Sequence, residues 1–495
     1  MNCWNRWLLI GMLLILAGCD RPVTPEAVSS DPVLVGTAAT PIATKPIPPT
    51  YYAATTPTPD PTRIVDTRQT ELYIVQQGDT VAAIAAEYNS TADEIGQVNG
   101  LSDVSKIKIG EPLNVPIHLD RVGPSAKLIP DSELVYGPST VEFDLSAFVD
   151  ESKGYLRAYT EPINGKPMTG AQIVQMIAQE YSVNPRLLLA VLEYRGDWVT
   201  NRTPTANAVA HPISNNVYAG ANLYEQLSWA ADHLNDGYYG WNGRAQQTLR
   251  FVDFTRARIG SGLNAGTVGV QTMLALDRSF EDWQKEVGPQ GFIATYRKLF
   301  GEPLNYSMEV VPPDVTQPVL TLPWAAGETW YYTGGPHGGW ASGSGWAAID
   351  FTPPDASNCY QSDHWAVAAA PGLVVRSENG EVMVSMDDSG HEQVGWAMLY
   401  MHMAAEDRVA VGTKLNAGDK IGHPSCEGGA ADATHLHIAR RYNGEWIPAA
   451  GSIPLVLDGW QVTGEATDYD GGLIKGNQIR VACECRDDAK NGISR

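Results

Sequence analysis

The sequence has few basic side chains for its length. Its 495 residues include 34 Lys and Arg against 56 Asp and Glu, which gives a formal net charge of −22 at pH 7. Binding to nucleic acid needs a basic face that meets the phosphates, so this balance argues against a nucleic-acid partner. Charged residues make up only 18% and hydrophobic residues 43%. Most of the chain is therefore expected to fold, and its length favours two to four domains.

Histidine and cysteine are also scarce, with ten and six copies in the chain. Seven of the ten His lie between His337 and His437, and four of the six Cys lie beyond residue 350. We therefore expect metal or acid–base chemistry in the C-terminal third. The 48 Gly, 33 Pro, 14 Trp and 21 Tyr favour aromatic-rich β structure with Gly turns over a helical bundle.

The apolar run near the start, Leu8 to Leu16, is too short to span a bilayer. It follows the basic Arg6 and ends in Leu16-Ala17-Gly18-Cys19, which resembles the lipobox of bacterial lipoproteins. The resemblance implies that residues 1–18 form a signal peptide and that Cys19 is acylated after cleavage. A lipid-modified Cys19 would hold the protein on a membrane, outside the cytoplasm.

Residues 19–70 are expected to form a linker. Positions 21–70 contain 10 Pro and 11 Thr and show no hydrophobic periodicity. Such a segment buries too little apolar surface to fold, and its prolines favour extended stretches. We interpret it as a spacer between the membrane and the folded part of the chain.

Residues 71–117 show the signals of a small βααβ module. The pattern predicts a strand at residues 72–75, a helix started by Asp79 or Thr80, a second helix near residues 91–98 and a strand near residues 107–115. The motifs Val75 to Val81, Asn99-Gly100-Leu101 and Ile107 to Leu113 closely resemble the LysM domain. The resemblance implies binding to N-acetylglucosamine-containing glycans such as peptidoglycan. The groove residues that it implies are Gly78, Asp79, Thr80, Val81 and Ile107.

Residues 135–310 are predicted to be mostly helical, since apolar residues recur at helical spacing and Pro185 suits a helix start. The segment Tyr181 to Ala190 resembles the opening of lysozyme-like lytic transglycosylases. In that family a catalytic Glu followed by Ser stands ten residues after the Pro, where this chain has Arg195 and Gly196. Glu193 stands two residues early and would point roughly 200° away around the helix. We therefore expect an inactive lysozyme-like domain or an unrelated helical domain.

The C-terminal third contains a constellation of metal-ligand residues. Its strongest part is His435-Leu436-His437, because alternate residues of a strand face the same way. His435 and His437 would then project together while Leu436 and Ile438 face the core. A catalytic zinc needs three protein ligands and one open position. His337 and Asp350 can supply the remaining nitrogen and oxygen ligands, so that one His does not bind the metal and handles protons, and His402 could be another such group.

These residues resemble the M23 family of zinc peptidases, which are peptidoglycan endopeptidases. The usual family pattern places the first His four residues before the Asp, where this chain has Trp346. The spacing of His337 and Asp350 is instead similar to that of the staphylolysin and β-lytic metalloendopeptidase branch. Further motifs of that branch are Leu322-Pro323-Trp324, Tyr400-Met401-His402-Met403, Cys426-Glu427-Gly428-Gly429 and Tyr442-Asn443-Gly444.

The resemblance implies that His337, Asp350 and His437 bind Zn²⁺, while His402 and His435 activate water or stabilise the oxyanion. It also implies a disulfide at Cys426, although the partner position of that branch, near Asn379, has no Cys here. Cys359 is an alternative partner. Cys483 and Cys485 are two positions apart, a spacing that seldom suits a disulfide, and the pairing of all four stays open.

The sequence thus predicts a multidomain protein with a βααβ LysM module, a mostly α middle domain and an antiparallel all-β peptidase domain at 318–455, followed by an extension at 456–495. The predicted function is a zinc metalloendopeptidase that cuts peptide bonds in peptidoglycan. Two alternatives remain. One is a non-enzymatic wall-binding or scaffold lipoprotein with an inactive peptidase domain, and the other is a dual hydrolase whose middle domain cleaves glycan.

Overall fold

The computed structural model describes residues 60–62, 69–217, 220–244, 246–387 and 389–495. The predicted signal peptide, the lipidation site Cys19 and most of the predicted linker lie outside these residues. Within the described ranges, no helix combines the length and the apolar character that crossing a membrane requires.

The first folded part is a βααβ module. Its elements are β1 (Thr70–Ile74), α1 (Val81–Glu87), α2 (Ala92–Asn99) and β2 (Pro112–Pro116). The two strands pair antiparallel, and the helices begin where Thr80 and Thr91 accept hydrogen bonds from backbone N–H groups of the first turn. Gly100 ends α2 in a left-handed conformation that favours glycine. The structure confirms the element order predicted from these local signals.

The second part, the helical region, comprises α3 to α10. The helices are α3 (Leu145–Ser152), α4 (Gly170–Tyr181), α5 (Pro185–Gly196), α6 (Ala206–Ala210), α7 (Leu223–Asn242), α8 (Ala265–Ala275), α9 (Phe280–Glu286) and α10 (Phe292–Phe300). Two antiparallel hairpins accompany them, β3 (Thr160–Ile163) with β4 (Lys166–Thr169) and β5 (Thr248–Arg250) with β6 (Arg256–Arg258). Pro185 starts α5 as predicted, and the Asn184 side chain caps that helix.

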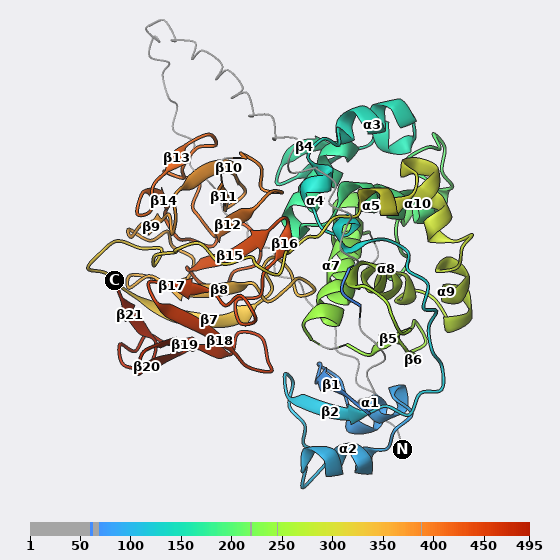
Figure 1. Ribbon diagram of the computed structural model, residues 1–495, viewed down its shortest axis with the longest axis horizontal. Helices are drawn as coiled ribbons and strands as arrows, with labels where there is room; N and C mark the ends of the chain where they lie inside the picture. The colour runs from blue at the N-terminus through green and yellow to red at the C-terminus, as the bar shows by residue number, and fades with distance from the viewer. Residues whose placement is uncertain (1–59, 63–68, 218–219, 245, 388) are drawn as a thin grey trace, which may run out of the picture. The chain divides into compact units, whose positions relative to one another are not determined.

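The third part is built on a nine-stranded sheet whose pairings are all antiparallel. Its strands are β7 (Thr329–His337), β8 (Ala348–Thr352), β10 (Gly372–Glu378), β11 (Glu381–Ser385), β12 (Trp396–Met401), β13 (Lys414–Leu415), β15 (Leu436–Tyr442), β16 (Glu445–Trp446) and β21 (Gly492–Ser494). The order is β13-β10-β11-β12-β15-β8-β7-β21, with β16 paired to β15. A separate pair joins β9 (Ala366–Val367) to β14 (Lys420–Gly422). In Figure 1 these strands run from gold at β7 through orange to red at β21.

The two faces of this sheet belong to different cores. Leu436 and Ile438 on β15 point into a core made by the sheet and the strands around it. Ala439 on the opposite face, together with Leu399 and Met401 of β12, belongs to a core that also contains the helices. His437 lies on this second face because it alternates with Leu436 and Ile438 along the strand.

Residues 456–495 take part in the sheet system. They form a four-stranded antiparallel sheet from β17 (Val456–Leu457), β18 (Trp460–Gly464), β19 (Gly471–Lys475) and β20 (Gln478–Val481). The last strand, β21, then pairs with β7, and Ile493 is buried in the core below it. These residues therefore support the strand that ends at His337.

Candidate metal centre

Three neighbouring strands bring His337, Asp350 and His437 together. His437 on β15 stands directly opposite Asp350 on β8, a pairing that places two side chains of one face in contact. His337 is the last residue of β7, which reaches β8 through two irregularities in register. Gly334 makes room on β7, since a Cβ at that position would lie 2.4 Å from Asp350 Oδ2. The alternation predicted for residues 435–438 thus places His437 on the face where it meets Asp350.

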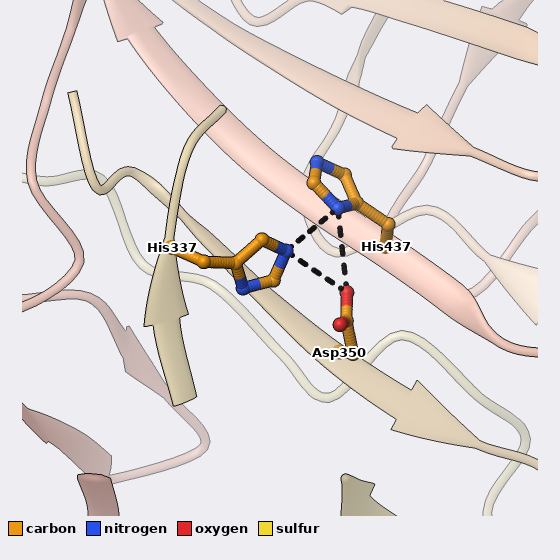
Figure 2. A group of neighbouring side chains, drawn as sticks. All are labelled: His337, Asp350 and His437. Atoms are coloured by element: carbon orange, nitrogen blue, oxygen red, sulfur yellow. Dashed lines mark hydrogen bonds and ion pairs between the residues drawn. The ribbon is translucent and has the colours of Figure 1, made fainter. Parts of the chain in front are cut away.

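The ligand atoms of these three residues converge on one point, as Figure 2 shows. Nε2 of His337 lies 3.0 Å from Nδ1 of His437. Oδ1 of Asp350 lies 3.4 Å from the first of these nitrogens and 3.3 Å from the second. Among the residues the structure describes, this is the group of His, Cys, Asp and Glu side chains that could hold a metal ion.

Backbone carbonyls fix the tautomers of both histidines. Nδ1 of His337 lies 2.8 Å from the carbonyl oxygen of Gly335, and Nε2 of His437 lies 3.2 Å from that of Gly339. A carbonyl oxygen can only accept, so each of these nitrogens carries a proton and donates it. In the neutral rings, the lone pairs of the other two nitrogens then face the centre. This is the arrangement in which protein sites orient histidine toward a metal.

Electrostatics also favour a cation at this point. Burial raises the pKa of Asp350, but the interactions with His337 first, and then with His437 and His435, outweigh burial and hold that pKa well below its usual value. Burial lowers the pKa of His337, whereas the charge of Asp350 raises it, with a net rise. Burial lowers the pKa of His437. Asp350 is therefore ionised and needs a positive partner, either a protonated His337 or a metal ion.

The residues present fit a zinc ion. Oδ1 of Asp350 is buried and has no hydrogen-bond donor among the described residues, although a buried polar atom is normally satisfied. Two imidazole nitrogens and one carboxylate oxygen are ligands that zinc accepts, and three protein ligands leave one position open. A metal at this point would satisfy Asp350 and separate the two facing lone pairs.

His402 and His435 stand beside this group. Their rings lie 4.4 Å apart, and Nε2 of His435 lies 3.8 Å from Oδ1 of Asp350. Nδ1 of each ring donates to a backbone carbonyl, of Glu427 for His402 and of Ala433 for His435. In both neutral rings Nε2 is therefore the basic nitrogen.

His402 has an unusual backbone and a shifted pKa. It follows β12 in the left-handed conformation, with φ 65°, which is costly for a residue with a side chain and recurs at functional sites. Its carbonyl accepts hydrogen bonds from the backbone N–H and the hydroxyl of Ser425. Burial, with help from the charges of His435 and His437, lowers the pKa of His402 to about 3. His402 is therefore neutral at neutral pH.

The three candidate ligands, together with His402 and His435, line a pocket of about 990 Å³. Two loops form much of its wall, with Ala356, Ser357 and Asn358 in one and residues 430–434 in the other. The disulfide Cys359–Cys426 joins the segments that carry these loops. Thr434 strengthens the link, because its hydroxyl donates to the carbonyl of Asn358 at 3.0 Å. The structure thus selects Cys359 as the partner of Cys426, and it pairs Cys483 with Cys485.

Residues 456–495 supply a part of the site that sequence reasoning missed. The ring of Tyr469 stacks on the ring of His337, with centroids 4.2 Å apart and an interplanar angle of 15°. The backbone of Tyr469 exchanges hydrogen bonds with residues beside His337, as its carbonyl accepts from Gly335 N–H and its own N–H donates to the Pro336 carbonyl. No motif marks Tyr469, so only the fold reveals this contact.

The predicted glycan-binding residues of the βααβ module hold that module together. The Asp79 carboxylate accepts hydrogen bonds from the Gln76 N–H and the Tyr73 hydroxyl. Thr80 caps α1, and Val81 is buried in the core of the module. Gly78 has a φ of 91°, which favours glycine, and Ile107 packs against the same core. These contacts leave their predicted role in glycan binding a prediction.

Glu193, the candidate acid of the middle domain, is used to hold a loop. It is 6% exposed, and its carboxylate accepts hydrogen bonds from the Val199 and Thr200 N–H groups and from the Thr200 hydroxyl. Arg195, at the expected position of a catalytic Glu, forms ion pairs with Asp277 and Glu286. Both side chains thus have structural partners inside the helical region.

Comparison with known families identifies two segments. Residues 73–116 match the LysM domain model, which confirms the prediction for the βααβ module. Residues 127–313 match the model of the LasA N-terminal domain. The motif from Tyr181 to Ala190, which resembles lysozyme-like domains, gives no indication of this LasA similarity. A search of curated proteins finds no match for the chain.

Several solved structures resemble parts of the chain. The M23 metalloprotease pseudoalterin, described as from the deep sea, is 21% identical over 37% of this chain and 99% of its own, with a TM-score of 0.29. The catalytic domain of the antimicrobial peptidase lysostaphin from Staphylococcus simulans is 21% identical over 25% of this chain and 89% of its own, with a TM-score of 0.19. The catalytic domain of EnpA, a prophage-encoded M23 protein from Enterococcus faecalis, is 20% identical over 26% and 95%, with a TM-score of 0.19.

Proposed function

We propose that this protein is a zinc-dependent metalloendopeptidase that hydrolyses peptide bonds in peptidoglycan. The observation that carries the proposal is the convergence of the ligand atoms of His337, Asp350 and His437 in a pocket. Backbone carbonyls orient both histidines toward that point, and within the described part of the chain no hydrogen-bond donor reaches Oδ1 of Asp350. A scaffold protein would have no need for such a set of oriented ligands.

The chain's own residues would carry the proton transfers. Zinc held by His337, Asp350 and His437 would supply Lewis acidity, which activates water and polarises a carbonyl group. Nε2 of His435 would accept the proton of the attacking water and later release it to the leaving amine. His402 stays neutral, so it would serve as a hydrogen-bonding group beside the reacting carbonyl and would not compete for that proton.

The walls of the pocket would hold an extended peptide. Residues 356–358 and 430–434 face the pocket from two loops, and the Cys359–Cys426 disulfide keeps these loops together. A fixed groove lowers the cost of ordering a flexible cross-link peptide, because less of the site has to rearrange on binding. The peptidase domain at 318–455 is in this proposal completed by residues 456–495, through Tyr469.

The remaining parts of the chain would keep the enzyme on its polymer. The LysM domain at 71–117 would bind the glycan strands of peptidoglycan, with Gly78, Asp79, Thr80, Val81 and Ile107 at its groove. Acylated Cys19 would anchor the protein to the membrane, outside the cytoplasm, beyond a signal peptide (1–18) and a linker (19–70). Both attachments raise the local concentration of substrate without new contacts in the active site.

The proposal is tested by a zymogram on purified peptidoglycan, with metal content measured on the same samples. Wild type is expected to clear the substrate, to contain zinc and to release new amino groups, which mark peptide cleavage. His437→Ala is expected to lose zinc and clearing. His391→Ala is the matched control, since His391 belongs to the same part of the chain and does not line the pocket.

Two outcomes would contradict the proposal. A wild type that clears peptidoglycan without bound metal would exclude a metalloenzyme, and so would a fully active His437→Ala. Release of reducing sugar ends together with new amino groups would instead favour the dual-hydrolase alternative, with glycan as a second substrate.

A further inference from the structure

The loop of residues 338–345 links two ligands of the candidate metal centre. It begins directly after His337 and leads into β8, which carries Asp350. The carbonyl of Gly339 in this loop accepts the hydrogen bond from Nε2 of His437. The position of one loop residue therefore sets the orientation of a ligand that comes from another strand.

Contacts inside the loop fix only a part of its conformation. The Trp340 N–H donates to the Ser344 hydroxyl at 3.2 Å, and that hydroxyl donates to the Ala341 carbonyl at 2.7 Å. Four of its eight residues are Gly, at positions 338, 339, 343 and 345, and Gly loses more conformational freedom on ordering than any other residue. Its base is closed by a hydrogen bond from Gly339 N–H to the Gly345 carbonyl, 3.0 Å long. Its tip is held from outside, by the helical region.

Asp232 on α7 holds the tip of the loop. One carboxylate oxygen of Asp232 accepts from Gly343 N–H at 2.8 Å, and the other accepts from the Ser342 hydroxyl at 3.1 Å. The backbones also meet closely, because a Cβ on Gly343 would lie 2.0 Å from the Asp232 carbonyl oxygen. A glycine at 343 is thus required for the loop to dock on α7.

Two further contacts press Gly339 into place. The indole of Trp446 lies against Gly339, where a Cβ would come within 2.4 Å of the ring. The helical region holds this Trp446, because its backbone N–H donates to the Tyr239 hydroxyl of α7 and its indole N–H donates to the Tyr181 carbonyl. The same helix therefore supports the loop at its tip and beneath Gly339.

We propose that α7 positions the metal ligand His437 through the 338–345 loop, with Asp232 as the positioning residue. The helical region would then contribute to metal binding by orienting one of the ligands. Asp232 touches neither the ligands nor the pocket, and it acts only by keeping the Gly339 carbonyl where His437 needs it. Loss of the direct hydrogen-bond partner of a metal-bound His costs about 10- to 100-fold in metal affinity, and Asp232, which acts on that partner through the loop, is expected at the lower end of this range. The inference rests on the proposed function, since it requires a metal at His337, Asp350 and His437.

The test compares Asp232→Ala, Asp232→Asn and Asp236→Ala in the full chain. Asp236 is the matched control, because it lies one turn further along α7 and pairs with Arg244 instead of the loop. The zinc dissociation constant is measured by competition with a chromophoric chelator, and the absorption spectrum of the Co²⁺-loaded protein reports ligand geometry. Thermal unfolding of the metal-free proteins separates a general loss of stability from a specific effect.

Asp232→Ala is expected to bind zinc about 10-fold more weakly and to shift the Co²⁺ spectrum. Asp232→Asn is expected to recover part of the affinity, since its amide oxygen can still accept from Gly343 N–H. Asp236→Ala is expected to match wild type in both measurements.

Wild-type zinc affinity and an unchanged Co²⁺ spectrum in Asp232→Ala would overturn the inference. If Asp232→Ala does not fold, Ser342→Ala decides, because it removes one of the two bonds from an exposed loop residue. A Ser342→Ala protein with unchanged metal affinity would overturn the inference equally. A wild type that binds no metal would instead contradict the proposed function itself, so the two failures are distinguishable.

Discussion

The hydroxyl of Tyr238 on α7 donates a hydrogen bond to Oε2 of Glu445 on β16, across 3.0 Å. The bond joins the helical region to the strand next to β15, from a buried Tyr238 to a partly buried Glu445. Burial and the nearby charge of Asp131 raise the pKa of Glu445 to about 8, against the partial opposition of Tyr238. Glu445 is therefore a neutral carboxylic acid in the folded protein below that pH.

This neutral acid predicts a loss of stability as the pH rises. Unfolded Glu445 ionises near its ordinary pKa of 4.5 and the folded group only near 8, so the folded state binds more protons between these values. The contribution of Glu445 to the free energy of unfolding is fully present below pH 4.5. It is lost as the pH rises through 8, at roughly 1 kcal/mol per pH unit. Urea unfolding of wild type and Glu445→Gln at pH 5 and pH 8 checks this. The variant should lose distinctly less stability over that interval, and equal losses would contradict the prediction.

The two disulfides should contribute unequally to stability. Cys359–Cys426 closes a separation of 67 residues and Cys483–Cys485 a separation of 2. Chain entropy then predicts a cost of about 4 kcal/mol for opening the first and about 2 kcal/mol or less for the second. Unfolding of Cys359→Ser/Cys426→Ser and Cys483→Ser/Cys485→Ser measures both. We expect only the first pair to lower peptidoglycan clearing as well, since it releases the walls of the pocket, and equal clearing by both would argue against that role.

Removal of the metal should lower the thermal stability of the protein. A ligand that binds only the folded state stabilises it by about 2.7 kcal/mol at a concentration 100 times its dissociation constant. Wild type is therefore expected to melt several degrees lower after treatment with a chelator and to recover on addition of zinc. Asp350→Ala is the control, since it lacks a ligand and its melting temperature should not respond to either treatment. A response in Asp350→Ala equal to that of wild type would place the metal elsewhere.

Glu193→Gln should leave hydrolysis of peptidoglycan unchanged. The Glu193 carboxylate accepts hydrogen bonds from Val199 and Thr200, so it is engaged inside the protein. Its loss is expected to cost about 1–3 kcal/mol of stability, because buried donors are left unsatisfied. Analysis of the soluble products for reducing ends, alongside unfolding measurements, separates the two effects. Loss of glycan cleavage in a stable Glu193→Gln would revive the glycosidase alternative.

The sequence predicted those features that depend on local signals. Thr80 and Thr91 stand at helix starts, where a side-chain oxygen can cap the first turn, and the structure caps both helices with them. The alternation around His437 likewise placed Leu436 and Ile438 in the core. A period of two residues is enough to assign faces to a strand, whatever lies next to it.

The remaining features depend on parts of the chain that are far apart. Nothing near Tyr469 indicates that its ring stacks on His337, and no pattern links Asp232 to Gly343. The spacing of the cysteines also left the partner of Cys426 open, because pairing depends on which loops the fold brings together. Such contacts follow from the packing of the helical region and the sheet, and a single sequence carries no local signal for them.

The pairing of β7 with β21 bears on the order in which the protein assembles. Tyr331, on the strand that ends at His337, stands opposite Gly492 near the far end of the chain. Contacts between residues so far apart in the sequence form slowly. The entropy cost of closing a long loop arises before the contact contributes any stabilising free energy. Capture of a metal ion needs His337 in place beside Asp350 and His437, so it is expected only when this edge of the sheet has closed. Bound metal would then mark fully folded molecules, because molecules in which β7 and β21 have not yet paired would not hold it.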